Sequence, residues 1–252
     1  MASGSGSGAG SSGQLRFGDK IFKQRFRMYQ NLFMRIVNAL ERQYKYFRFR
    51  EDVSGRPGHT PIQKCTAAIR QLAYGDATDM FDEYLHISET TARQCLKYFC
   101  QGVIEIFSER YLRKPTPEDC QTLMDMHGNQ HGPEMLGSID CMHWEWKNCL
   151  TAWKGQCTTG FKGKNPTMIL EAIADYRLWI WHACPIDEKK IYFAQRQEET
   201  RKDVEPAFGV LQARWAALNG PTRLWYPDCI ADVMYACTIM HNMIVEDESR
   251  TD

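Results

Sequence analysis

The sequence lacks the features of several protein classes. No apolar run in its 252 residues approaches the ~18 residues that a membrane-spanning helix needs. Residues 1–8 contain neither the basic stretch nor the apolar stretch of a secretory signal. The ten cysteines form no CxxC pair, which favours free thiols in a reducing compartment over a disulfide framework. We therefore expect a globular protein inside the cell.

The chain also has no net charge, but its charges are unevenly distributed. Between Gln14 and Arg50 ten lysines and arginines face only two acids, Asp19 and Glu41. Aromatic side chains alternate with basic ones from Tyr44 onward, which suits contact with phosphates and stacked bases. An amphipathic helix over 26–47 with a solvated basic face explains the same residues equally well.

The chain divides into a tail and two regions. Residues 1–13 are almost entirely glycine, serine and alanine, and we expect them to stay flexible. Helical apolar spacing predicts a helical region over 14–127, followed by a second region over 134–248. The fold class expected is mixed α/β.

The helical region has the layout of a helix-turn-helix. Three helices are predicted between residues 62 and 109, with a short link at 86–88 and Ser88 as a helix N-cap. The helix that follows would present Arg93, Gln94 and Lys97 to base edges and phosphates. Three packed helices with no nucleic acid fit the same pattern.

The second region begins with strands. Residues 139–146 alternate so that Asp140 shares one face with Met142, Trp144 and Trp146. Residues 167–174 and 178–183 are predicted to form a hairpin around 175–177, and helical spacing returns over 198–218 and 228–245.

Two carboxylates in this region have the order of a nuclease site. Asp140 lies in a first strand and Glu205 near a later helix, the arrangement of nucleases built on the ribonuclease H scheme. Such sites cluster acids because Mg²⁺ prefers oxygen ligands and two ions must flank the scissile phosphate. A zinc site from dispersed thiols and imidazoles is a weaker alternative, because close ligand pairs are missing from Cys141, His143, Cys149, Cys157 and His182.

Several motifs carry a family resemblance that runs from about residue 17 to residue 248. They include Gly-Ser-Ile-Asp at 137–140 and Ala-Trp-Lys-Gly at 152–155, and they continue at 178–183, 193–195, 201–205, 207–215 and 241–248. In this order they closely resemble plant PIF/Harbinger transposases and their domesticated nuclease-like relatives. The resemblance implies an N-terminal helix-turn-helix-like region followed by a ribonuclease H-like nuclease core whose signature is Asp, Asp, Glu.

The resemblance matches the first acid to Asp140 and the last to Glu205, but this chain has no counterpart of the middle aspartate. Relatives carry several dozen residues between the segments matching 178–183 and 193–195, whereas this chain has only nine. We therefore expect a truncated core that lacks a segment between about 184 and 190. Asp175, Asp187 and Asp203 are not expected to fill the gap, because metal ligands need rigid support.

A second departure is Pro206, where relatives commonly have arginine. Proline disfavours the α conformation of the preceding residue, so we expect either a kinked helix or one that starts at Pro206. Either change would redirect Glu205.

The resemblance also implies cofactors and partners. The family uses a divalent metal, Mg²⁺ or Mn²⁺, and acts on DNA in the nucleus, with the cytoplasm as an alternative location. Lys154, Lys162 and Lys164 could contact DNA phosphates near Asp140, although a solvated loop explains them equally well.

Three hypotheses follow. The first is a nuclear, DNA-associated protein with a degenerate cleavage site. The second is an active endonuclease whose gap is a gene-prediction error. The third is a scaffold that keeps only the association with a Myb-like partner.

Overall fold

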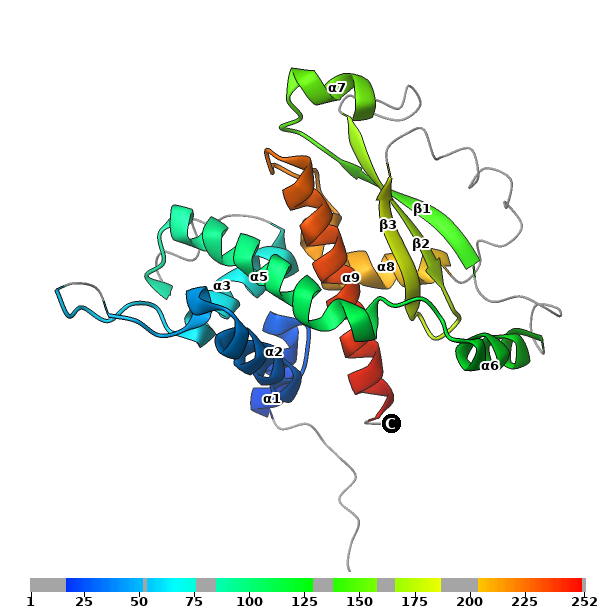
Figure 1. The fold of residues 1–252 in the computed structure, drawn as a ribbon, viewed down its shortest axis with the longest axis horizontal. Coiled ribbons are helices and arrows are strands. Elements are labelled where there is room, and N and C mark those ends of the chain that lie inside the picture. The colour runs from blue at the N-terminus through cyan, green and yellow to red at the C-terminus, as the bar shows by residue number, and fades with distance from the viewer. Residues whose placement is uncertain are drawn as a thin grey trace, which may run out of the picture.

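The computed structural model describes residues 17–51, 54–75, 85–128, 138–157, 166–186 and 204–250. Helices pack against one another and against a three-stranded antiparallel sheet (Figure 1), which confirms a mixed α/β chain. Across these ranges, none of the helices combines the length and the apolar character needed to cross a membrane. The ribonuclease H-like scheme stays a prediction.

The basic N-terminal segment forms two helices, α1 (Phe17–Phe26) and α2 (Gln30–Gln43). The amphipathic helix expected over 26–47 is present as α2 but is shorter at both ends. Arg27 has a φ of 61°, a left-handed conformation that separates the two helices, and α2 ends at the extended Tyr44. The apolar stripe that suggested one helix lies within α2, and the short 3-10 helix η1 (Lys45–Phe47) then buries Phe47.

The next helices have strong caps. Thr60 and Gln63 form a capping box at the start of α3 (Pro61–Tyr74), and the left-handed Gly75 ends it. The helix α5 (Glu89–Tyr111) begins where Ser88 accepts a hydrogen bond from the backbone of Thr91, which confirms the predicted N-cap. Residues 76–84, where the first helix of the helix-turn-helix was expected, lie outside the described residues. The helix α6 (Pro117–Gly128) follows α5.

The sheet has the order β1-β2-β3, and its strands are β1 (Ser138–Glu145), β2 (Thr167–Ala174) and β3 (Ile180–Ile186). All pairs are antiparallel, so the predicted hairpin around 175–177 is confirmed. Met142, Trp144 and Trp146 are buried, which also confirms the predicted core face of the first strand. The short helix α7 (Thr151–Cys157) lies between β1 and β2.

The C-terminal helices join the sheet to the N-terminal helices. The helix α8 (Val204–Arg214) packs against β1 and β2, and the 3-10 helix η4 (Ala216–Leu218) packs against α3. The long helix α9 (Pro227–Ser249) contacts both α5 and β3. One cluster of buried side chains consequently extends from Met28 to Ile244. The expected boundary at 128–133 falls at the end of α6 and in residues 129–137, which lie outside the described part of the chain.

Candidate metal and nucleic-acid sites

The first acid, Asp140, lies on β1 opposite Ala172 of β2. Its side chain is half-buried and belongs to the strand face that also carries Met142 and Trp144. This face is the one that α8 covers, because Gln212 of α8 donates a hydrogen bond to the sulfur of Met142 at 3.1 Å. The helix that carries Glu205 therefore packs on the Asp140 face of the sheet.

The residues that follow α8 contact the last part of β1 and the residue just beyond it. Farther along β1, the indole nitrogens of Trp144 and Trp146 donate to the carbonyls of Gly220 and Leu224, each at 2.7 Å. From residue 142 to residue 146, the contacted partners therefore run from residue 212 to residue 224, in the same direction along the chain. Glu205 is exposed and precedes Gln212 by seven residues, about two helical turns, so it shares a side of the helix with Gln212. Glu205 therefore lies near the start of the helix whose later part contacts Met142.

Pro206 lies inside the first turn of α8 and not at its first position. α8 begins at Val204, so Pro206 is the third residue of the helix rather than its first, and Glu205 already has helical geometry. The first four N–H groups of a helix have no intrahelical acceptor, so proline costs no hydrogen bond there. The expectation that the helix begins at Pro206 is wrong.

A third metal ligand does not accompany these two acids in the described part of the chain. Residues 17–51, 54–75, 85–128, 138–157, 166–186 and 204–250 contain no group of three or more His, Cys, Asp or Glu side chains placed to hold a metal ion. The same finding disfavours the alternative zinc site. Asp187, Asp203, Lys162 and Lys164 lie outside the described residues. Lys154 is exposed on α7.

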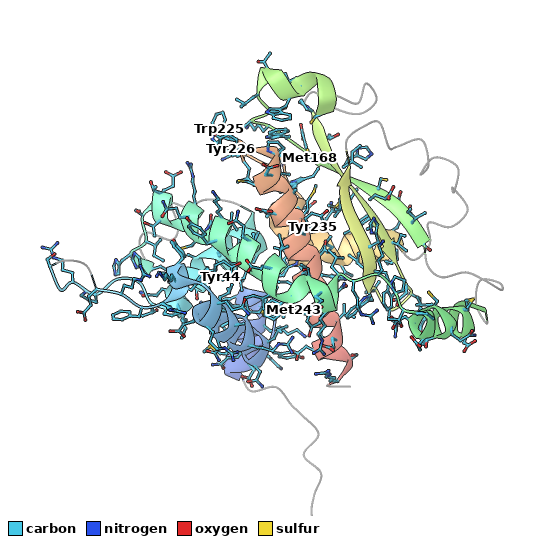
Figure 2. The ribbon with its side chains drawn as sticks, viewed as in Figure 1. Tyr44, Met168, Trp225, Tyr226, Tyr235 and Met243 are labelled. Atoms are coloured by element: carbon cyan, nitrogen blue, oxygen red, sulfur yellow. The ribbon has the colours of Figure 1, made fainter. Side chains whose placement is uncertain are left out.

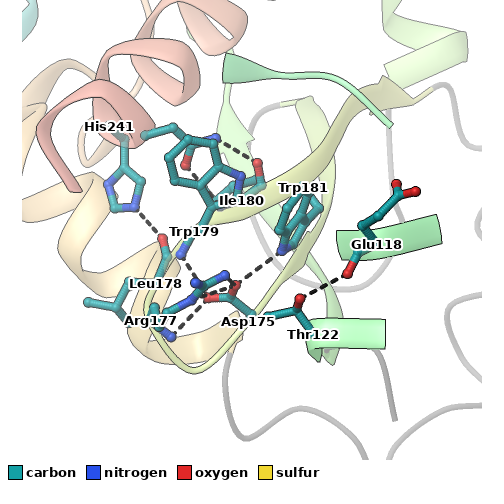
Figure 3. A network of polar contacts seen from close by, with 10 residues as sticks. Glu118, Thr122, Asp175, Arg177, Leu178, Trp179, Ile180, Trp181 and His241 are labelled. Carbon is teal, nitrogen blue, oxygen red and sulfur yellow. Dashed lines mark hydrogen bonds and ion pairs between the residues drawn. The ribbon is translucent and has the colours of Figure 1, made fainter. Parts of the chain in front are cut away.

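Asp175 is the most completely enclosed carboxylate of the sheet region, with no exposed surface (Figure 3). It accepts hydrogen bonds from the backbone of Arg177 at 2.9 Å and from the guanidinium of Arg177 at 2.7 Å. It also accepts from the backbone of Trp179 at 3.3 Å and from the indole of Trp181 at 3.1 Å. These donors compensate the cost of burying the charge, so Asp175 holds the β2–β3 turn and is not available to a metal ion.

His241 and Asn242 hold the same turn from α9. A ring nitrogen of His241 lies 2.7 Å from the carbonyl oxygen of Leu178, the residue that occupies a left-handed conformation. Burial, reinforced by the charge of Arg214, lowers the pKa of His241 to about 4. The neutral ring donates to Leu178 and accepts from Arg214, which lies 3.3 Å from its other nitrogen.

Asn242 completes this attachment. Its oxygen accepts from the backbone of Ile180 at 2.9 Å, and its amide donates to the carbonyls of Ile180 at 2.7 Å and Tyr111 at 2.6 Å. One buried side chain thus joins α9, β3 and the end of α5. The sequence singled out the 241–248 motif only through its resemblance to a family and gave no indication of this structural role.

The N-terminal helices present a separate polar surface. Arg93, Gln94 and Lys97 are all exposed on the first turns of α5, and Arg93 forms an ion pair with Glu89. The neighbouring Tyr98 packs its ring against Tyr46, with 4.4 Å between centroids. The segment that leaves η1 therefore starts beside the exposed face of α5.

That segment forms an arm, defined here as residues 48–51 and 54–60. A β-bridge joins Glu51 to Pro57, and the backbone of Gly58 donates to the carbonyl of Arg50 at 2.9 Å. A side chain at Gly58 would meet that carbonyl oxygen at 2.6 Å, so only glycine fits. The arm projects from the helices (Figure 1) and carries Arg50 and Arg56 on its exposed surface.

A family model described as plant transposon protein matches residues 109–186 and 183–252. The chain belongs to the plant transposon protein family. The matched segments contain both Asp140 and Glu205, and they meet at residues 183–186, within β3. No curated protein and no solved structure matches this transposon family member.

Proposed function

We propose that this chain is a transposase-derived, nuclease-like protein of the PIF/Harbinger type that associates with DNA and carries a degenerate phosphodiester-cleaving site. The observation that carries the proposal is that α8, which carries Glu205, packs on the face of β1 that carries Asp140, inside a chain of the plant transposon family. Two acids on a strand and on the helix that packs against it are the remnant expected from a three-acid site.

The residues present do not fit a two-ion centre. Two Mg²⁺ or Mn²⁺ ions need several clustered oxygen ligands in near-octahedral geometry, and the described residues supply no third ligand. Asp175 directly follows β2 in the sequence, but its oxygens already accept hydrogen bonds from Arg177, Trp179 and Trp181. Cleavage by the family's chemistry is therefore not expected of this chain.

Isothermal calorimetry with Mg²⁺ and Mn²⁺ tests the metal site. We expect at most weak binding, with a dissociation constant in the millimolar range, because two carboxylates cannot enclose two ions. Asp140→Ala is the matched control and should leave the titration nearly unchanged. Tight binding of two ions that Asp140→Ala abolishes, or nicking of a supercoiled plasmid by the wild-type chain, would show an active nuclease instead.

The junction of the two matched segments bears on the active-enzyme hypothesis. The two matched segments of the family model meet at residues 183–186. This pattern is expected when a chain lacks a piece from the middle of the family's sequence. Sequencing the transcript across residues 183–190 separates a true loss from a gene-prediction error. A longer message encoding the middle aspartate would favour the active endonuclease.

The surface formed by α5 and the arm supports the DNA association. A helix that presents Arg93, Gln94 and Lys97 suits the major groove, and a short arginine-bearing arm beside it suits an adjacent minor groove. Both elements carry exposed cations, and phosphate contacts dominate the affinity of such complexes.

Fluorescence anisotropy with labelled duplex DNA at several salt concentrations tests this surface. Arg50→Ala and Lys97→Ala should each weaken binding and lower the salt dependence by about one unit of slope. Lys114→Ala, an exposed lysine just beyond the other end of α5, is the charge-matched control. Equal effects at all three positions would contradict a defined DNA-binding surface.

A chain that binds no duplex but co-purifies with a Myb-like DNA-binding protein would favour the scaffold hypothesis. Whether the chain binds DNA itself or acts as a scaffold, we propose that it is located in the nucleus, which a fluorescent fusion would reveal.

A further inference from the structure

Four large apolar side chains are exposed on two segments, one at the start of α7 and one that leads into α9. The exposed fractions are 40% for Leu150, 38% for Trp153, 53% for Trp225 and 64% for Tyr226. We call these four residues the aromatic corner. Clusters of exposed aromatic side chains are unusual on a soluble chain and commonly mark a binding surface.

The fold builds the aromatic corner from two segments that are bound to each other. Beyond β1, the backbone of Lys147 donates to Thr222 at 2.9 Å, and Thr222 donates back to Glu145 at 2.7 Å. The side chain of Asn148 donates to the carbonyl of Arg223 at 2.6 Å. Leu150 and Trp153 follow directly on one segment, and Trp225 and Tyr226 follow on the other.

A buried anchor makes this junction rigid. Trp146 is fully buried and donates its indole N–H to the carbonyl of Leu224, the residue before Trp225. Figure 2 shows Trp225 and Tyr226 together at the end of α9 nearest to α7. The backbone that carries the exposed rings is therefore attached to the core, which limits the backbone entropy lost on binding.

The charges beside the aromatic corner favour an anionic partner. Lys147, Lys154 and Arg223 are exposed on the same two segments, against two acids, the partly buried Glu145 and the exposed Asp228. Indole and phenol rings offer flat faces to other rings, and the cations suit phosphates. This combination is typical of surfaces that bind single-stranded nucleic acid.

We infer that the aromatic corner binds an unpaired DNA strand, whose bases stack on Trp225 and Tyr226 while its phosphates contact Lys154 and Arg223. Duplex DNA fits less well, because its bases already stack on one another and offer no free face. This inference deepens the proposed DNA association but uses a different surface from α5 and the arm. β1 ends at Glu145, five residues after Asp140 and about 17 Å away at the rise of a strand, and the aromatic corner lies beyond that end.

A protein partner is the competing occupant, since tryptophan, tyrosine and arginine also dominate protein interfaces. The excess of cations over acids favours DNA, and the experiment separates the two by measuring both ligands.

The test measures fluorescence anisotropy of a labelled oligo-dT strand and of a duplex of equal length, using the full chain. Trp225→Ala should weaken oligo-dT binding about tenfold, because one stacked base loses its platform, and Trp225→Phe should restore most of the affinity. Tyr176→Ala removes an aromatic side chain of similar exposure, 40%, at the β2–β3 turn and should change nothing. Circular dichroism checks that each variant is folded.

Duplex binding should be unchanged in all of these variants. If wild type and Trp225→Ala bind oligo-dT equally, or neither binds it, the inference is wrong even if duplex binding persists. Loss of duplex binding on mutation of α5 or the arm bears only on the proposed function. Concentration-dependent self-association that Trp225→Ala abolishes, without oligo-dT binding, would show that the aromatic corner is a protein interface.

Discussion

Two carboxylate regions of the sheet differ in what surrounds them. At the β2–β3 turn, Asp175 is fully buried and accepts hydrogen bonds from two backbone N–H groups, a guanidinium and an indole. At the other region, Asp140 is half-buried on β1 and Glu205 is exposed on α8. A buried carboxylate needs donors to offset its desolvation, whereas a carboxylate that solvent reaches can still accept a metal ion.

The difference shows that resemblance to a catalytic family does not make every motif catalytic. The 241–248 motif contains His241 and Asn242, whose contacts with Leu178, Ile180 and Tyr111 hold the β2–β3 turn against α9. The motif at 137–146 contributes Asp140 but also Trp144 and Trp146, which are core residues. Core residues therefore surround the predicted site residue within one family motif.

The largest expected effect comes from removing the buried carboxylate. Asp175→Ala should lower the free energy of unfolding by about 3 kcal/mol, because it leaves the Arg177, Trp179 and Trp181 donors without their acceptor. Asp140→Ala, the matched change at the other region, should cost less than about 1 kcal/mol. Urea denaturation measures both. Similar losses would remove the contrast between the two regions.

A second effect depends on pH. The pKa of His241 is lowered to about 4, mainly by burial, while the unfolded chain titrates near 6.5. The stability from its neutral ring is complete above about pH 6.5 and is lost as the pH falls through 4, because the unfolded state binds the proton first. Linkage gives about 3 kcal/mol over this range.

His241→Gln removes this titration and can keep a donor for Leu178. Urea denaturation at pH 7 and pH 4 should therefore show a smaller pH-dependent loss for the variant than for wild type. An unchanged pH dependence would argue that His241 is already protonated in the folded chain.

The smallest effect is expected at Pro206. Because this residue lies in the first turn of α8, Pro206→Ala restores an N–H that has no intrahelical acceptor, and stability should change by less than about 0.5 kcal/mol. Thermal unfolding followed by circular dichroism measures the change. Gly209→Ala, at an exposed site farther along α8 with open space for a side chain, is the control for general helix stabilisation. A gain at Pro206 larger than at Gly209 would show that the proline strains the helix.

Much of the local structure could be predicted from residue patterns. The alternation in 139–146, the hairpin around 175–177 and the N-cap at Ser88 are confirmed because each depends on neighbours along the chain. The break at Arg27 could not be predicted, because a non-glycine residue in a left-handed conformation has no distinctive sequence signal. The start of α8 before Pro206 is compatible with proline in a first helical turn, but the sequence allowed several starts.

The sequence by itself determined the family, the strand that carries Asp140 and the helix that carries Glu205, since these follow from motifs and short-range periodicity. Only the tertiary structure decided which carboxylates are used for folding. Asp175 and Asp140 are both aspartates of the sheet region, and their different surroundings come from residues distant in sequence or folded back at a turn. The hydrogen-bond partners of Asp175 lie two to six residues farther along its own hairpin, but its burial depends on the packing of that hairpin against α9, which no local pattern encodes.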